Sequence, residues 1–114
     1  MSTLNPDQII APAAITPAAA TQYYVVPANT VTTIRRITFC NVTATAATFT
    51  VYYVPNLGAF GITNMVINEE RLGPKKSVSP PELEGLVLEA GDTIWIATGT
   101  DAAITVVGAG TEIS

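Results

Sequence analysis

The chain has 114 residues, of which 48% are hydrophobic and only 12% charged, and its formal net charge is -4. This length fits one domain with its own core, and the small number of Lys and Arg residues argues against the basic surface that nucleic acid or an anionic membrane requires. Because the sequence lacks His, the usual general base and zinc ligand, we expect no enzymatic activity and no metal or cofactor.

Three prolines interrupt residues 1–21, which are otherwise rich in alanine. Because proline blocks the propagation of a helix, we expect an extended, polyproline-like arm that lies outside a domain formed by residues 22–114. The large apolar side chains of this arm would be more stable if buried, and a neighbouring subunit could cover them. They are Ile9, Ile10 and Ile15.

The rest of the chain is rich in Thr, Val and Ile, which favour strands, and it shows no helical periodicity. Strands are expected at residues 23–26 and 31–42. Between them lies a turn at residues 27–30, in which Pro27 fixes one dihedral angle and Asn29 tolerates the left-handed region.

The long strand at residues 31–42 has an irregular pattern, because Ile34 and Ile37 would face opposite sides of a regular strand. A β-bulge at Arg35 and Arg36 would turn both isoleucines inward. The arginines would then pair with an acidic residue of a neighbouring subunit or remain hydrated, and the sequence leaves both open. The acidic candidates are Glu82, Glu84 and Glu89.

Residues 48–53 alternate cleanly between apolar and more polar side chains, which makes them the clearest amphipathic strand in the sequence. The loop that follows, residues 55–61, carries two apolar side chains that we expect to be exposed. Leu57 and Phe60 are therefore candidates for contact with a partner.

The second half of the chain predicts short strands separated by turns. The prolines at 80–81 mark an edge or a bend, and a helical turn near Glu69 remains open. Residues 93–98 and 103–107 are expected to form a hairpin, followed by an edge strand at 109–113. Further strands are expected at residues 65–67, 76–78 and 86–88. Together these elements predict an all-β fold, a single jelly-roll-like or Ig-like antiparallel β-sandwich.

Few residues point to chemistry. Glu82 and Glu84 would share one face of an extended segment at a spacing that overlaps that of glycosidases, but such pairs usually mark a solvated edge. Cys40 is expected to pack as a small hydrophobic residue. Gly108 and Gly110 lack the strand-to-helix context of a dinucleotide loop. The aromatic residues that could form a sugar platform, or pack in the core or an interface, are Tyr23, Tyr24, Tyr52, Tyr53 and Trp95.

Four segments, taken in order, resemble small virion proteins of tailed bacteriophages, which are short β-sandwich proteins. The segments are Tyr24–Thr30, Thr33–Thr43, Thr48–Pro55 and Gly85–Ile94. The resemblance implies a structural protein that is made in the host cytoplasm and resides in the virion. It carries over no catalytic residue.

The low content of charged residues fits such a role, because a surface of Thr and Ala loses little hydration when a partner covers it. We expect a protein that decorates or cements the capsid as a homo-oligomer, preferably a trimer, and contacts virion proteins such as the major capsid protein. The alternatives are a neck, collar or tail-fibre component, a carbohydrate-binding module with an aromatic face around Tyr52 and Trp95, or a secreted β-domain whose surface stays hydrated. The candidate interface residues are Ile9, Ile10, Ile15, Arg35, Arg36, Leu57 and Phe60.

Overall fold

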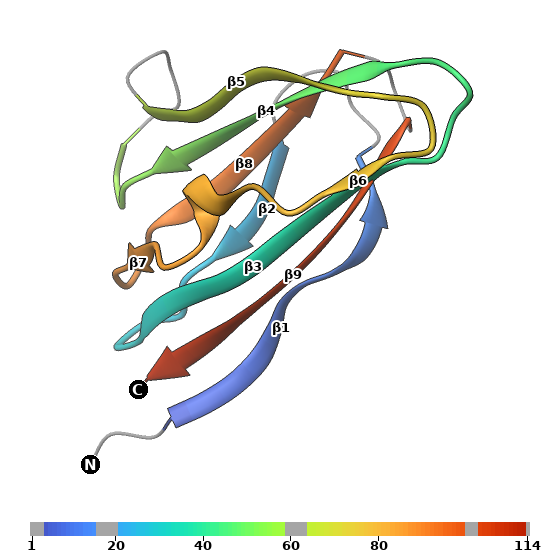
Figure 1. The fold of residues 1–114 in the computed structure, drawn as a ribbon. Helices are drawn as coiled ribbons and strands as arrows, with labels where there is room; N and C mark the ends of the chain where they lie inside the picture. Colours follow the sequence, from blue (N-terminus) through green and yellow to red (C-terminus); the bar gives the residue numbers. More distant parts are fainter. Residues whose placement is uncertain (1–3, 16–20, 59–63, 100–102, 114) are drawn as a thin grey trace.

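The computed structural model describes residues 4–15, 21–58, 64–99 and 103–113. These residues form nine strands and one short 3-10 turn, arranged in two antiparallel sheets that face each other (Figure 1). The elements are β1 (Leu4–Ala14), β2 (Thr21–Val25), β3 (Val31–Asn41), β4 (Ala47–Val54), β5 (Met65–Leu72), β6 (Ser77–Val78), η2 (Pro81–Leu83), β7 (Val87–Leu88), β8 (Thr93–Thr98) and β9 (Ile104–Ile113).

The strand order is that of a jelly roll. The first sheet, sheet A, has the order β1-β9-β3-β6, and β7 also pairs with β3; the second, sheet B, has the order β2-β8-β4-β5. The short strands β6 and β7 pair with opposite ends of β3, so they act as two pieces of one edge strand. The chain therefore follows the eight-strand, two-sheet pattern of a jelly roll, which confirms the predicted fold class.

The N-terminal segment belongs to the sandwich, which differs from the expected arm. β1 pairs antiparallel with β9 along its length. Ile9, Ile10 and Ile15 are buried in the same core as the side chains of the other strands. The prolines do prevent a helix, but an edge strand tolerates them because one of its sides has no ladder to complete. Residues 4–15 thus share a core with the rest of the chain.

Two glycines of β9 make room for the strands on either side of it, β1 and β3. Register shifts in β1 turn the consecutive residues Ile9 and Ile10 to the same side of the sheet. A Cβ atom on Gly108 would lie 3.3 Å from the Cβ of Ile10, and one on Gly110 would lie 2.7 Å from the carbonyl oxygen of Thr33. Larger residues at these two positions would push the neighbouring strands away.

The bulge expected at the two arginines is present. The pairing of β3 with β9 shifts between Ile34 and Arg36. As a result Ile34 and Ile37 are both fully buried, while Arg35 and Arg36 are exposed. The turn before β3 also forms as predicted, with Asn29 in the left-handed region at φ 58°.

The last two strands do not form the expected hairpin. β8 lies in sheet B, whereas β9 lies in sheet A between β1 and β3 (Figure 1). Residues 109–113, expected to be an edge strand, are the C-terminal half of this central strand. Alternation of side chains shows which face of a strand is buried, but it does not show which strand lies alongside.

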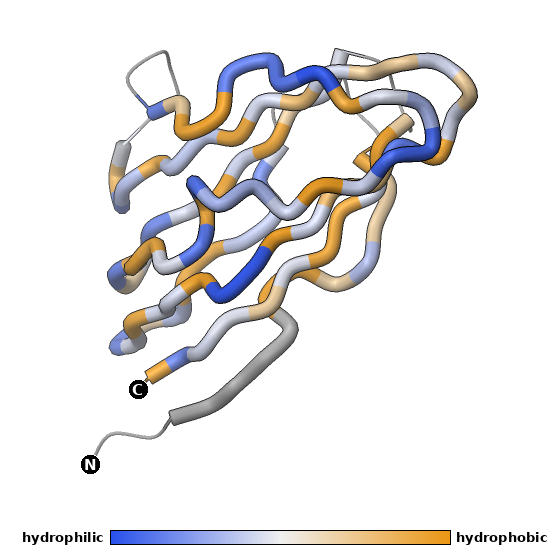
Figure 2. The backbone as a smooth tube through the Cα atoms, in the orientation of Figure 1, coloured by the Kyte–Doolittle hydropathy of each residue, from blue (hydrophilic) through white to orange (hydrophobic). Residues whose placement is uncertain are grey.

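Side chains from both sheets meet in the core. Phe39 of β3 and Phe49 of β4 stack across the sandwich, with ring centroids 4.2 Å apart. Figure 2 shows hydrophobic and hydrophilic residues alternating along the strands that contribute to this core.

The helical turn that the sequence left open near Glu69 does not form. Strand β5 continues through this residue, which has φ 48° within the strand. In the described part of the chain, no helix is long and apolar enough to cross a membrane.

Candidate functional site

Three connections meet at one end of the sandwich, which we call the loop end. They are residues 26–30 between β2 and β3, residues 55–58 after β4, and residues 89–92 before β8. Val26 joins two of them, because it donates one backbone hydrogen bond to the 89–92 turn at 2.9 Å and accepts another from it at 3.1 Å.

The carboxylate of Asp92 holds the loop end together from within. Its side chain is 6% exposed. It accepts a hydrogen bond of 2.6 Å from the Tyr53 hydroxyl and bonds of 2.9 Å from the backbone N–H groups of Asn56 and Glu89. One buried carboxylate thus fixes two separate connections, because it has enough acceptor sites for all three donors.

This network shifts the pKa values of both acidic groups. Burial alone raises the pKa of Asp92, but the hydrogen bonds from Tyr53 and from the backbone of Glu89 and Asn56 outweigh it, so the pKa is lowered overall. Burial, the hydrogen bond to Asp92 and the nearby negative charges together raise the pKa of Tyr53 to about 12. Both groups therefore keep their hydrogen-bonding forms at neutral pH.

Leu57 stands at the tip of the fixed 55–58 turn and is 100% exposed. Asp92 binds the preceding N–H group, and the Gly58 N–H donates to the carbonyl of Pro55 at 2.9 Å. Leu57 itself has φ 65°, an unusual value for a branched residue. A large apolar side chain is thus held in solvent on an ordered turn. Other exposed valines flank or precede the connections of this end: Val25, Val31 and Val87.

The other candidate interface residues fall into different surroundings. Ile9, Ile10 and Ile15 are covered by their own chain. Arg35 and Arg36 lie on the outer face of sheet A beside a hollow of about 310 Å³, and their pairing with an acidic residue of a neighbour stays a prediction. The last candidate, Phe60, lies outside the described residues.

The structure also places the few residues that the sequence analysis considered for chemistry. The η2 turn makes the segment at Glu82 and Glu84 non-extended, so the two carboxylates do not share a strand face. Cys40 is half-buried, because its neighbour Phe39 takes the inward position. Among the described residues, no three His, Cys, Asp or Glu side chains gather in a group that could hold a metal ion. In the same residues every buried side-chain nitrogen or oxygen has a hydrogen-bond partner.

The aromatic residues divide between the core and the outer face of sheet B. Tyr24 points inward, and its hydroxyl contacts Thr32 at 2.7 Å and the Glu112 carboxylate at 2.6 Å. Tyr52 and Trp95 are register partners on β4 and β8, and both are half-buried. Two of the five aromatic residues considered for a sugar platform, Tyr52 and Trp95, are therefore neighbours in space.

No protein-family model matches the sequence, and no curated protein matches it significantly. Among solved structures, the chain resembles a protein of Bacillus endospore appendages, a novel family of disulfide-linked pili, with a TM-score of 0.48 and 15% identity over 99% of this chain and 88% of that chain. It also resembles a chain of infectious bursal disease virus Gt strain (TM-score 0.46) and one of the VP2 subviral particle of that virus (TM-score 0.37). Each viral match has 13% identity and covers 98% of this chain but 32% of the viral chain. These scores and identities are too low to assign a family or a function.

Proposed function

We propose that this protein is a non-enzymatic structural component of a bacteriophage particle, which decorates or cements the capsid as a homo-oligomer. The observation that carries the proposal is the loop end, where an ordered turn presents the fully exposed Leu57. The jelly-roll frame and the low content of charged residues support it, because such a surface is covered at little cost in lost hydration.

A second copy of the chain is the partner that we assign to Leu57. Burying a leucine side chain contributes about 1.5–3 kcal/mol, and a closed ring repeats that contribution at every subunit contact. Since Asp92 already fixes the 55–58 turn, little conformational entropy is lost when a neighbour covers it. We prefer a trimer, because three is the smallest number of copies that a head-to-tail contact is expected to join into a closed ring.

Light scattering coupled to size exclusion tests the self-association directly. We expect a stable oligomer at tens of micromolar, and we expect Leu57→Ser to shift it toward monomer. Val42→Ser is the matched control. Val42 is also an exposed apolar residue, at 54%, but it directly follows the last residue of β3, whereas the loop end lies at the first residue of that strand. A monomeric wild-type protein, or equal effects of the two substitutions, would contradict the proposed contact.

Attachment to the particle is expected to depend weakly on salt, because screening weakens charge pairs but not apolar contacts. The measurement is the fraction of protein left on particles after washes from low to about molar NaCl, compared with the Arg35→Ala, Arg36→Ala double variant. Release at moderate salt, reproduced by the double variant at low salt, would show that the arginines hold the protein in place.

A low-resolution map of the particle would separate capsid decoration from a neck, collar or tail-fibre position.

A further inference from the structure

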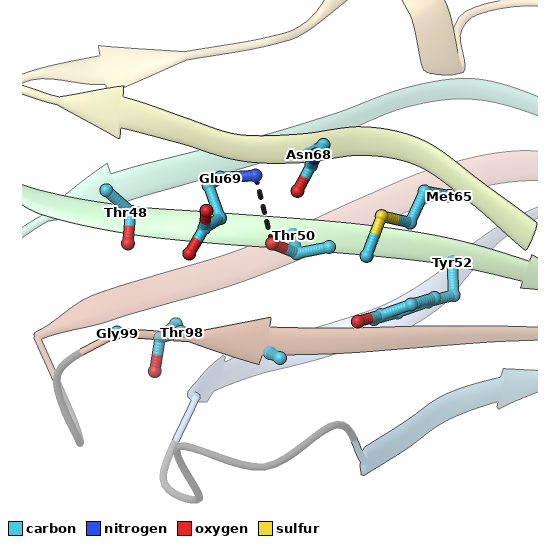
Figure 3. A pocket seen from close by; sticks show the side chains of 9 residues that line it. Thr48, Thr50, Tyr52, Met65, Asn68, Glu69, Thr98 and Gly99 are labelled. Carbon is cyan, nitrogen blue, oxygen red and sulfur yellow. Dashed lines mark hydrogen bonds between the residues drawn. The ribbon is translucent and has the colours of Figure 1, made fainter. Parts of the chain in front are cut away.

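A hollow of about 370 Å³ opens on the outer face of sheet B (Figure 3). From its shape and chemistry we infer that it binds a ring of an uncharged sugar, a function beyond the structural role proposed above. Its volume lies at the small end of the range for ligand sites, which suits one or two sugar rings. The lining residues come from β4, β5 and the end of β8.

A β-bulge gives this hollow two consecutive polar side chains. In the pairing of β4 with β5, the single residue Thr50 lies opposite both Asn68 and Glu69. The Thr50 hydroxyl accepts a hydrogen bond of 3.0 Å from the Glu69 N–H group and fixes the bulge. In a regular strand these neighbours would face opposite sides of the sheet, whereas here both line the hollow.

The hollow has one apolar end and one polar end. Figure 3 shows the Tyr52 ring and the Met65 thioether together at one end, while Thr48 and Thr98 lie toward the other. A pyranose ring has the same division, since its C–H groups form an apolar face and its hydroxyls form a polar rim. An aromatic ring with a thioether can pack against the first, and the hydroxyl, amide and carboxylate groups can bond the second.

A glycine sets the wall at the polar end. The Gly99 N–H donates to the Thr48 carbonyl at 3.0 Å, so the two residues are held together. A Cβ atom on Gly99 would lie 2.7 Å from the Thr48 hydroxyl oxygen. Any larger residue at position 99 would therefore displace that hydroxyl from the wall.

The negative charge in the lining favours an uncharged ligand over an anionic one. Among the described residues, the lining contains one carboxylate, that of Glu69, and no Lys or Arg. Arg71 is exposed and pairs in register with Thr48, but it is not among the lining residues. A phosphate, a sulfate or an acidic sugar would meet an uncompensated negative charge, whereas sugar hydroxyls can donate charge-assisted hydrogen bonds to it.

The test is a titration of the ¹⁵N-labelled full chain, followed by backbone amide shifts. The probes are glucose, galactose, mannose and N-acetylglucosamine, each added to about 50 mM, with glycerol as a control for a generic polyol. We expect at least one sugar to give saturable shifts at lining residues such as Glu69 and Gly99 with a Kd of the order of 1 mM, and no such shifts near Leu57.

Two variants of the lining and one control variant make the result specific. Glu69→Gln removes the charged acceptor at nearly constant shape and is expected to weaken binding about tenfold, whereas Glu82→Gln, at an exposed position on η2, is expected to leave it unchanged. Gly99→Ala is expected to weaken binding through the wall while shifts elsewhere keep the folded pattern. The inference is overturned if none of the sugars gives saturable shifts, if glycerol gives the same ones, or if Glu69→Gln binds as well as Glu82→Gln. Because self-association is measured at Leu57, failure here leaves the structural role standing, and the reverse also holds.

Discussion

Replacing Ile10 with Ala tests whether β1 is a core strand or an arm. Ile10 is 3% exposed, and it packs where β9 has Gly108. Substitution of Ile by Ala in a core costs 2–5 kcal/mol, and because β1 is an edge strand that can partly relax, we expect about 3 kcal/mol. The same change in a free arm would alter the free energy of unfolding by less than about 0.5 kcal/mol.

Urea unfolding followed by Trp95 fluorescence measures this loss. With a slope of about 1.5 kcal/mol per molar urea, the midpoint should fall by about 2 M. Val42→Ala is the control, since this side chain is 54% exposed and lies away from the contact proposed for Leu57, so its removal should lower the free energy of unfolding by less than about 1 kcal/mol. The loss at Ile10 should be the same at low and high protein concentration, because β1 packs on its own chain. If Ile10→Ala and Val42→Ala were indistinguishable, β1 would not belong to the core.

Other substitutions test the loop end. Asp92→Asn should lower the free energy of unfolding by about 2 kcal/mol at pH 7, since it weakens hydrogen bonds to a charged acceptor. Because folding lowers the pKa of Asp92, its contribution is present above the unfolded value near 3.8 and is lost as the pH falls below it, so urea titrations of wild type and variant should converge in acid; a constant gap would speak against this role. Folding raises the pKa of Tyr53 from 10.0 to about 12, so the wild type should lose stability as the pH rises through that interval. Circular dichroism should show a smaller loss in Tyr53→Phe, in which only the other tyrosines can ionise. Gly91 and Gly85 both have φ 86°, but only at Gly91 would a Cβ atom meet a neighbour, at 2.4 Å from the Cγ of Asn56. Thermal unfolding should therefore show a loss of about 1 kcal/mol for Gly85→Ala and about twice that for Gly91→Ala; equal losses would mean that Asn56 moves aside freely.

Local patterns in the sequence were sufficient for the fold class and for some details. The mismatch between Ile34 and Ile37 is a property of neighbouring residues, so it correctly indicated the bulge at the arginines. Asn29 similarly marked a left-handed turn position, because that conformation depends on the residue itself.

Features that depend on distant partners were missed. The prolines of residues 1–21 argued against a strand. Strand β1 tolerates them because it lies at the edge of a sheet and packs against the glycines of β9, and neither fact can be read from the residues of the segment itself. The role of Asp92 was also missed, since Tyr53 and Asn56 lie 39 and 36 positions away in the sequence. An acidic residue in a Gly-containing turn before a strand is the only local signal, and it fits a solvated turn equally well.

The two long outer strands have a consequence for how copies behave when crowded on a surface. β1 includes Pro6 and Pro12, which cannot donate to a further strand, and β5 is interrupted by the bulge at Glu69 and carries charged residues. Both features oppose the addition of a strand from another molecule, which is the first step toward fibrous aggregates. Dense arrays of this protein should therefore be dispersed by conditions that weaken contacts between side chains, and the subunits recovered from them should still be folded.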